Sequence, residues 1–217
     1  MQALAEKVFK LGPPGGVFDG TVVINLFPDA SQGARKLLVN RALSHNEIIR
    51  LKPGVYCLSP DLRRTHPHPF VVAALLLSPS HVSLESALSH HGLIPEAVFQ
   101  VASVTAHRSR VFTTPMGRFE FHRIPCNNPK AGVRAEKLDA DSWAFVASPL
   151  RAIADLVYLR KSISWDRDGL RFLTDSMRID ETDLRDLSFA GFNDICRSLR
   201  NRRTRDYLVG LRKELQQ

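Results

Sequence analysis

The sequence predicts an α+β protein in which a small N-terminal winged helix-turn-helix precedes a larger mixed α+β domain with a helical C-terminal part. Three observations predict this class. Helix, turn, helix and hairpin patterns follow one another within the first 60 residues, a polar stretch with prolines comes next, and β-type segments then give way to helical ones. A chain of 217 residues can form two unequal domains, which we place at residues 1–62 and 70–217.

The N-terminal part begins with three predicted helices. Residues 1–10 suit a short helix, which the glycines and prolines of LGPPGG end. Asp19 is a good N-cap for a helix over residues 20–27. The residues predicted to form the buried stripe of that helix are Val22, Val23, Leu26 and Phe27. After a turn at Pro28-Asp29, Ser31 is the predicted N-cap of a third helix that runs from Gln32 to about Ser44.

The third helix and the hairpin after it complete the winged helix-turn-helix pattern. Placed on a helical wheel, one side of the helix carries Ala34, Leu38 and Ala42, and the opposite side carries Lys36, Asn40 and Ser44. Two β-type runs, residues 47–51 and 55–59, then flank Lys52-Pro53-Gly54. Because proline fixes φ at one turn position and glycine accepts positive φ at the next, we predict a hairpin with a basic tip.

The larger domain is predicted to combine strands and helices. Residues 70–77 suit a strand or a helix, and residues 83–91 suit a helix that ends at Gly92. The predicted strands are residues 101–105, 108–113 and 118–124. Ser148-Pro149, an N-cap followed by proline, opens a helix that continues to about Arg160. The rest, residues 167–215, is predicted to be rich in helix, with turns at Gly169, Asp180 and Gly191.

Charge is distributed unevenly along the chain. The net charge is +8, which suggests a polyanionic partner. Residues 31–60 carry five basic residues and one acid, and residues 197–205 carry five arginines and no acid, whereas residues 161–194 carry eight acids against five bases. The Arg197–Arg205 cluster has three open interpretations: a phosphate site, a partner of the acidic segment, or a solvated helix face.

Membrane and disulfide-rich classes do not fit the sequence. No apolar run approaches the roughly 20 residues that span a bilayer, and the N-terminus has neither an apolar leader nor a small-residue cleavage site. Cys57, Cys126 and Cys196 lie far apart and are odd in number, so they predict neither a disulfide framework nor a zinc site. We therefore expect a cytoplasmic protein without a membrane partner.

The histidine and acidic pairs do not match the spacing of known metal or catalytic centres. His66/His68 and His90/His91 lack the i, i+4 spacing of metal ligands on a helix. Asp139/Asp141 and Asp166/Asp168 could bind a divalent ion, but they lie in polar segments predicted to be exposed. No acid is followed two positions later by lysine, the pattern of one large class of metal-dependent nucleases, and no P-loop, GxGxxG or GxSxG occurs. We predict a non-enzyme with no metal and no cofactor.

The third helix and the hairpin carry the candidate DNA-binding site. A helix reads the major groove through side chains that reach base edges and phosphates, and its N-terminal amides suit a phosphate. The candidate DNA-binding residues are Ser31, Gln32, Arg35, Lys36, Asn40, Arg41, Arg50 and Lys52. The alternative is that these residues are solvated charges on an ordinary surface.

Three stretches resemble the AbiEi family, the antitoxins of bacterial type IV toxin–antitoxin systems, which often occur in phage-defence operons. They are NEIIRLKPGVYCLSP at residues 46–60, a longer stretch at residues 78–125, and ASPLRAIADLVYLR at residues 147–160. The most specific part is residues 82–125, where SLESAL, HGLIPE, SVT and TPxGxF follow in order. Asn46 stands where glycine is expected, and SPLRAI stands where SPxKAL is expected; both changes are conservative.

The resemblance implies a winged-helix domain that binds inverted repeats in its own promoter and represses transcription. It also implies a C-terminal domain that counteracts a nucleotidyltransferase toxin encoded beside it, without any need for direct contact. We therefore predict a DNA-binding transcriptional autorepressor and antitoxin whose partners are double-stranded DNA and, functionally, that toxin. Two alternatives stay open: a protein-interaction module that directly clamps the toxin, with DNA binding secondary, and an enzyme that acts on nucleic acid.

Overall fold

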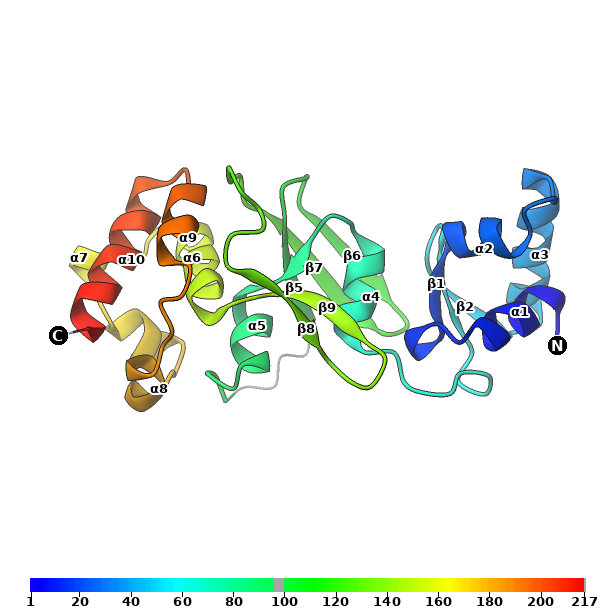
Figure 1. Cartoon of the computed structure of the whole chain (residues 1–217), viewed down its shortest axis with the longest axis horizontal. Coiled ribbons are helices and arrows are strands. Elements are labelled where there is room, and N and C mark those ends of the chain that lie inside the picture. The colour runs from blue at the N-terminus through cyan, green and yellow to red at the C-terminus, as the bar shows by residue number, and fades with distance from the viewer. Residues whose placement is uncertain (96–99, 217) are drawn as a thin grey trace. The chain divides into compact units, whose positions relative to one another are not determined.

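The protein has an α+β fold, as predicted, which divides into two compact units (Figure 1). A computed structural model describes residues 1–95 and 100–216, so residues 96–99, part of the stretch that resembles the AbiEi family, lie outside the described residues. The first unit comprises Met1–Ser78, Phe112–Gly117 and Lys137–Trp143. The second comprises Pro79–Val111, Arg118–Glu136 and Ala144–Gln217.

Three helices open the first unit at the predicted places. They are α1 (Ala3–Leu11), α2 (Gly20–Leu26) and α3 (Gln32–Ser44), with a short 3₁₀ turn, η1 (Pro14–Gly16), after α1. The Asp19 carboxylate accepts hydrogen bonds from the amides of Thr21 and Val22 at the start of α2. The Ser31 hydroxyl accepts one from the Ala34 amide at the start of α3. Both predicted N-caps are therefore confirmed, because each satisfies an amide that lacks a partner within its helix.

A three-stranded antiparallel sheet follows α3. The predicted hairpin is formed by β2 (Ile48–Lys52) and β3 (Val55–Leu58), and β1 (Val17–Asp19) pairs with the other edge of β3, which gives the order β1-β3-β2. Gly54 turns the hairpin with φ of 84°, and Asn46 enters it in the left-handed region with φ of 55°. The sequence did not predict β1, because three residues after a glycine pair carry too little pattern to indicate a strand.

The core of the first unit lies between the three helices and the sheet. Its buried members include Leu4, Val8, Phe18 and Ile48. Of the predicted α2 stripe, Val23 is a buried member of this core, and Val22, Leu26 and Phe27 are partly buried against it. On α3, Leu38 and Ala42 pack on the core together with Val39 and Leu43, whereas Ala34, on the same side of the helical wheel, is exposed. These four lie one turn apart on a single side of the helix, whereas Ala34 is in the first turn, beyond the edge of the core.

The first unit also contains α4 (Pro69–Leu76), which settles the choice between strand and helix for this apolar run. Pro69 occupies the first helical turn, where its missing amide costs nothing, and the His68 ring accepts a hydrogen bond from the Phe70 amide. Val72, Ala73 and Leu76 are buried. An apolar run of eight residues fits both periods, so its surroundings decide.

A six-stranded sheet in the order β6-β7-β5-β4-β9-β8 is formed by strands most of whose residues belong to the second unit. Its strands are β4 (His81–Val82), β5 (Gln100–Thr105), β6 (Arg110–Thr114), β7 (Gly117–Arg123), β8 (Val133–Lys137) and β9 (Trp143–Ala147). β5 runs parallel to β7 and antiparallel to β4, while β4 runs parallel to β9. The three predicted strands are confirmed. The other three strands were not predicted. β4 has only two residues, and the edge strand β8 is mostly polar. β9 forms a strand because it pairs with residues that are distant in sequence.

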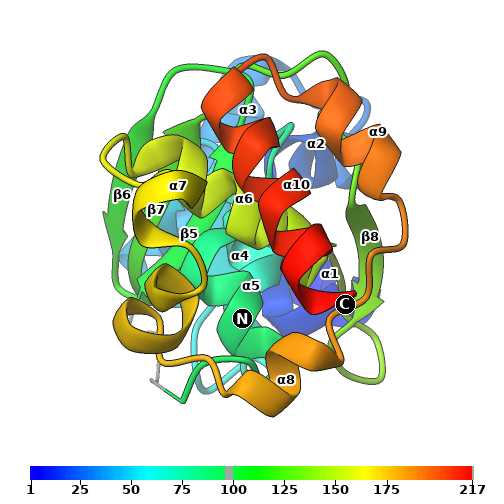
Figure 2. The same cartoon turned by 90° about the vertical axis from the view of Figure 1, so that its left-hand side faces the viewer.

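The described residues of the second unit also form seven helical segments, and the predicted helical C-terminal part is confirmed. They are α5 (Leu84–His90), α6 (Pro149–Leu159), α7 (Trp165–Asp168), a π-helical turn η2 (Phe172–Ser176), α8 (Glu181–Arg185), α9 (Phe192–Ser198) and α10 (Arg202–Leu215). α6 contacts both α5 and α10, and Figure 2 shows α10 at the front of this group. Gly169, Asp180 and Gly191 stand at helix ends, as predicted.

Removing the α3 cap is expected to weaken the first unit. Ser31→Ala takes away the acceptor of the Ala34 amide, so the free energy of unfolding should fall by about 1 kcal/mol, measured by urea denaturation. Ser44→Ala, at the other end of the same helix, is the control and should change it by less than about 0.5 kcal/mol. Equal losses in the two variants would contradict the capping role.

Candidate nucleic-acid interface and a buried ion pair

A groove in the first unit brings five of the eight predicted DNA-binding residues together. It lies between α2, α3 and the β2–β3 hairpin and has a volume of about 500 Å³. The predicted residues that line it are Gln32, Arg35, Lys36, Asn40 and Arg50. The other residues that line it are Gly20, Val23, Ile24, Val39, Gly54 and Tyr56. Ser31, Arg41 and Lys52 do not line the groove.

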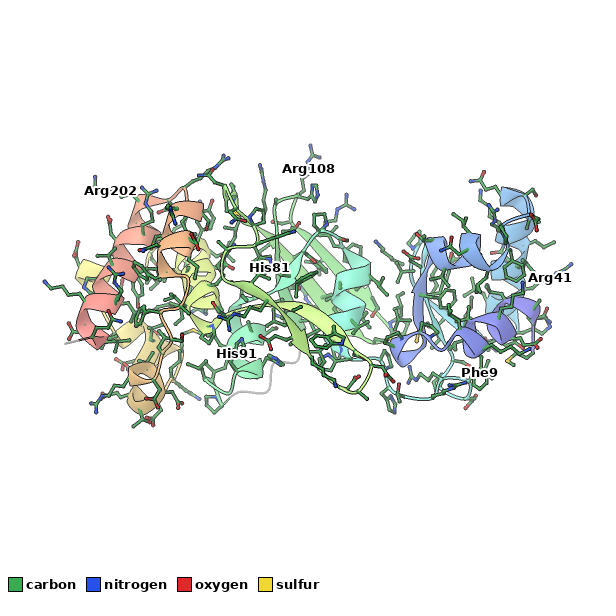
Figure 3. The ribbon with its side chains drawn as sticks, viewed as in Figure 1. Phe9, Arg41, His81, His91, Arg108 and Arg202 are labelled. Atoms are coloured by element: carbon green, nitrogen blue, oxygen red, sulfur yellow. The ribbon has the colours of Figure 1, made fainter. Side chains whose placement is uncertain are left out.

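Apart from Arg35, the polar residues of α3 face solvent. Gln32, Lys36, Asn40 and Arg41 are exposed, and Figure 3 labels Arg41 on this helix. Arg50, on β2, is exposed as well. Within residues 1–95 and 100–216, no ion pair engages Lys36, Arg41 or Arg50, so their positive charges are available to an external anion.

Arg35 and Ser31 serve the fold of the first unit. The Arg35 guanidinium donates to the carbonyl oxygen of Phe27 at 2.9 Å and to that of Pro28 at 2.7 Å. These carbonyls follow the last turn of α2, so Arg35 fixes the turn between α2 and α3. The Ser31 hydroxyl caps α3. The side chains of both residues are therefore already engaged within the protein.

Lys52 is also engaged within the first unit. Its ammonium donates to the carbonyl oxygen of Leu76 at 2.5 Å and lies 5.5 Å from the centre of the Phe112 ring. The carbonyl belongs to the last turn of α4, where helical carbonyls lack partners within the helix. Of the two basic residues predicted to bind DNA from the hairpin, Arg50 is therefore the one whose charge remains at the surface.

Comparisons with known proteins add no assignment. No protein-family model matches the chain, and no curated protein matches it. The resemblance to the AbiEi family, which rests on the motifs quoted above, therefore stays a prediction.

A fully buried ion pair lies within the second unit. The Arg151 guanidinium, through Nε, donates to Asp155 Oδ1 at 2.9 Å, one turn along α6, and both side chains are fully buried. Arg151 Nη1 also donates to the carbonyl oxygen of Ala131 at 2.7 Å. Asp155 Oδ2 accepts a hydrogen bond from the Ser83 hydroxyl at 2.7 Å, and His81 Nε2 lies 3.7 Å from it. The pair thus joins α6 to the start of α5, to β4 and to the loop before β8.

Burial and charge act in opposite directions on this pair. Burial alone would raise the pKa of the Asp155 carboxyl, but the Arg151 guanidinium, with His81 and Ser83 beside it, outweighs burial and lowers that pKa. For Arg151, burial would lower the pKa, and the Asp155 carboxylate raises it overall. Both groups are therefore charged in the folded protein.

Sequence reasoning missed this pair, although a signal was present. In PLRAIADLVYL, Arg151 and Asp155 are the charged residues of an otherwise apolar helix, four residues apart. A helix that is apolar on all sides is buried on all sides, so charges within it must pair.

His81 also borders a cavity within the second unit. The cavity has a volume of about 390 Å³ and is mostly apolar, with Val104, Ile124, Val133 and Phe145 in its walls. Cys126, half-buried, lines it too. Figure 3 labels His81, which contacts both the cavity and the buried ion pair.

The arginine cluster near the C-terminus has partners within the second unit. Arg203 donates to the carbonyl oxygens of Val157 and Tyr158 at 2.8 and 3.3 Å, which caps the C-terminal end of α6. Arg197 pairs with Asp194, at the end of the acidic segment, at 2.7 Å. Of the three interpretations, pairing with the acidic segment is thus observed for Arg197, and Arg203 has a fourth role that the sequence did not suggest.

The acidic pairs considered as ion sites act locally. Asp168 accepts a hydrogen bond from the Ser164 amide at 2.8 Å and pairs with Arg167, and Asp139 accepts one from the Asp141 amide at 3.1 Å. In the part of the chain that the structure describes, no three His, Cys, Asp or Glu side chains are grouped to hold a metal ion. In that same part, no helix is both long and apolar enough to cross a membrane.

Proposed function

We propose that the protein is a sequence-specific regulator that binds double-stranded DNA through α3 and the β2–β3 hairpin, without catalysis of its own. In this proposal the first unit is a winged helix-turn-helix: α2 and α3 are its helix pair, and β2 and β3 form the wing. The observation that carries the proposal is the groove in which exposed residues of α3 face Arg50 of the hairpin, with no acidic residue among the described residues that line it.

The chemistry of this surface suits a DNA duplex. The major groove admits one helix, and the amides of Gln32 and Asn40 can each form two hydrogen bonds with an adenine. Lys36 can donate to the O6 and N7 atoms of guanine. Arg50, on the hairpin, is placed for the phosphates beside the groove, contacts that supply affinity without reading sequence.

The biological role that we propose follows from the motif resemblance. The DNA would be the protein's own promoter, bound at inverted repeats, which makes the protein an autorepressor. It would also be the antitoxin for a nucleotidyltransferase toxin encoded beside it. The order of motifs over residues 82–125, together with the adjoining basic helix and hairpin, supports this role.

A gel shift with the DNA upstream of the protein's own gene tests the proposal. We expect a shifted band that an unlabelled copy of the same fragment removes and a shuffled fragment does not. The affinity should fall as salt rises, because binding releases counterions from the phosphates. No shift at low salt, or a shift that is the same for every sequence, would reject the proposal.

A second candidate is a module whose second unit directly clamps the toxin. The observation that favours it is a set of exposed acids around α7 and α8: Asp166, Asp175, Glu181, Asp183 and Asp186. Such a surface could bind a basic partner. Co-purification with the neighbouring gene product decides between the two candidates, since a stoichiometric complex that survives high salt requires direct contact.

A further inference from the structure

Two residues on the exposed side of α3 have no evident role in the fold. Gly33 and Leu37 lie four positions apart, so they share one face of the helix one turn apart. Lys36 and Asn40 flank them on the side that faces the protein's own groove between α2, α3 and the hairpin, and Arg41 flanks them on the other side. This surface therefore combines a residue without a side chain and an aliphatic one, surrounded by polar residues.

Gly33 is not required by the packing of the protein. Among the residues that the structure describes, a Cβ atom at this position would meet only the Ser31 hydroxyl oxygen, at 3.9 Å, an ordinary contact distance. Its φ is not in the left-handed region where glycine is favoured. A helix that contains glycine is less stable than the same helix with alanine at that position. The bare backbone thus lowers the stability of α3 without serving the protein's own contacts, as expected where an external molecule approaches closely.

Leu37 is unusual for its place. It is 50% exposed, although its helix neighbours Val39 and Ala42 are buried. A single exposed leucine on an ordinary surface needs no explanation. In the proposed function, however, the face of α3 that carries Leu37 lies in the major groove of the DNA. Most base edges in that groove offer hydrogen-bonding groups. The apolar group on those edges is the methyl group of thymine.

We propose that Gly33 and Leu37 form a notch that reads the 5-methyl group of thymine. The methyl group lies over the Cα of Gly33 and packs against the Leu37 side chain, while the polar neighbours bind adjacent base edges. This inference rests on the proposed function and deepens it, because it requires a thymine at a defined position of the DNA site. The open space at Gly33 and the exposure of Leu37 are two independent observations on one face.

Deoxyuridine substitution is the test, because uracil keeps every hydrogen-bonding group of thymine and lacks only the methyl group. The full chain is titrated onto a short labelled duplex from its promoter and onto duplexes in which one thymine at a time is deoxyuridine. We expect the wild type to lose about threefold to tenfold in affinity at one thymine of each half-site, the size expected for one buried methyl group. Leu37→Ala should bind the thymine duplex more weakly than the wild type does, by a similar factor. On the deoxyuridine duplex, Leu37→Ala and the wild type should have the same affinity.

Gly33→Ala is an independent test, because it should maintain or raise the stability of the protein while it lowers the affinity for DNA. The variant should melt at the same temperature as the wild type or higher, because alanine favours the helix. Its affinity for the thymine duplex should fall at least tenfold, since the added methyl group occupies the notch. Val209→Ala, at a valine of α10 that is also 50% exposed, is the control and should leave DNA binding unchanged.

The outcomes separate this inference from the proposed function. If the wild type binds no DNA, the proposed function fails, and the inference fails with it. If the wild type binds but every deoxyuridine duplex binds as well as its thymine counterpart, the notch is overturned and DNA binding stands. If Leu37→Ala weakens binding but keeps the full loss at the deoxyuridine position, Leu37 acts on the fold and the methyl reading is again overturned.

Discussion

Asp155→Ala should lower the free energy of unfolding of the protein by about 3–5 kcal/mol, the usual cost of breaking a buried ion pair. The change removes the partner of Arg151 Nε and of the Ser83 hydroxyl, and leaves a guanidinium charge that no solvent reaches. An uncompensated charge in such a place costs more than the pair contributes when intact. Urea denaturation followed by circular dichroism measures the loss.

Asp194→Ala is the matched control for that prediction. Asp194 binds Arg197 at 2.7 Å, comparable to the Asp155–Arg151 distance, but both side chains are exposed, so its loss should cost less than about 1 kcal/mol. The double variant Arg151→Met with Asp155→Leu should be more stable than Asp155→Ala, because an apolar pair leaves no charge buried. If Asp155→Ala lowers the free energy of unfolding no more than Asp194→Ala does, the structural role of the buried pair is contradicted.

The same pair should make stability depend on pH. Because the pKa of Asp155 is lower in the folded protein than in the unfolded chain, its ionisation stabilises the fold above the unfolded value of about 4. That contribution is lost as pH falls through the lower folded value. Acidification from pH 6 should therefore reduce the difference in unfolding free energy between wild type and Asp155→Ala, measured by thermal melts across the range. A difference that stays constant from pH 6 down to about pH 2 would contradict a lowered pKa of Asp155 in the folded protein, because protonation of the unfolded chain below about pH 4 must then reduce it.

Lys36→Ala and Asn40→Ala should each weaken binding to the promoter duplex by about 1–3 kcal/mol, the usual value of a direct base contact. Both residues are exposed on α3, so neither change should affect the fold. The discrimination between promoter and shuffled duplex should shrink together with the affinity. Fluorescence anisotropy with the two duplexes measures both quantities.

Arg50→Ala separates phosphate contacts from base contacts. This variant should lose affinity for both duplexes alike and should lower the dependence of log affinity on log salt by about one unit. Lys213→Ala, which removes an exposed charge from α10, is the control and should change neither quantity. If Lys36→Ala behaves like Lys213→Ala, α3 does not lie in the groove of the duplex.

The structure also revises what is expected of Lys52. From the sequence, Lys52 and Arg50 belong to one basic hairpin and should act alike on DNA. In the structure the Lys52 ammonium is bound to the carbonyl oxygen of Leu76. Lys52→Ala should therefore leave the salt dependence nearly unchanged, in contrast to Arg50→Ala.

Local patterns were sufficient to predict many elements of this fold. α2 and α3 begin where Asp19 and Ser31 predict, because an N-cap is a contact between residues two or three apart. The hairpin turns at Pro53-Gly54 because these residues have few other conformations available. β1, β4, β8 and β9 could not be predicted in the same way, because a strand depends on a partner that is distant in sequence.

The sequence by itself therefore determined the local features: the caps, the turns, the helices of clear period and a basic, acid-poor segment around α3. Only the tertiary structure decided which of the basic side chains remain at the surface. Arg35 and Lys52 carry the same charge as Lys36 and Arg50, but they bind backbone carbonyls at the ends of helices. It also decided that Arg151 and Asp155 are buried together. The physical reason is that local conformation depends on neighbours in the chain, whereas the partner of a charged side chain depends on which distant carbonyl or carboxylate the fold brings beside it.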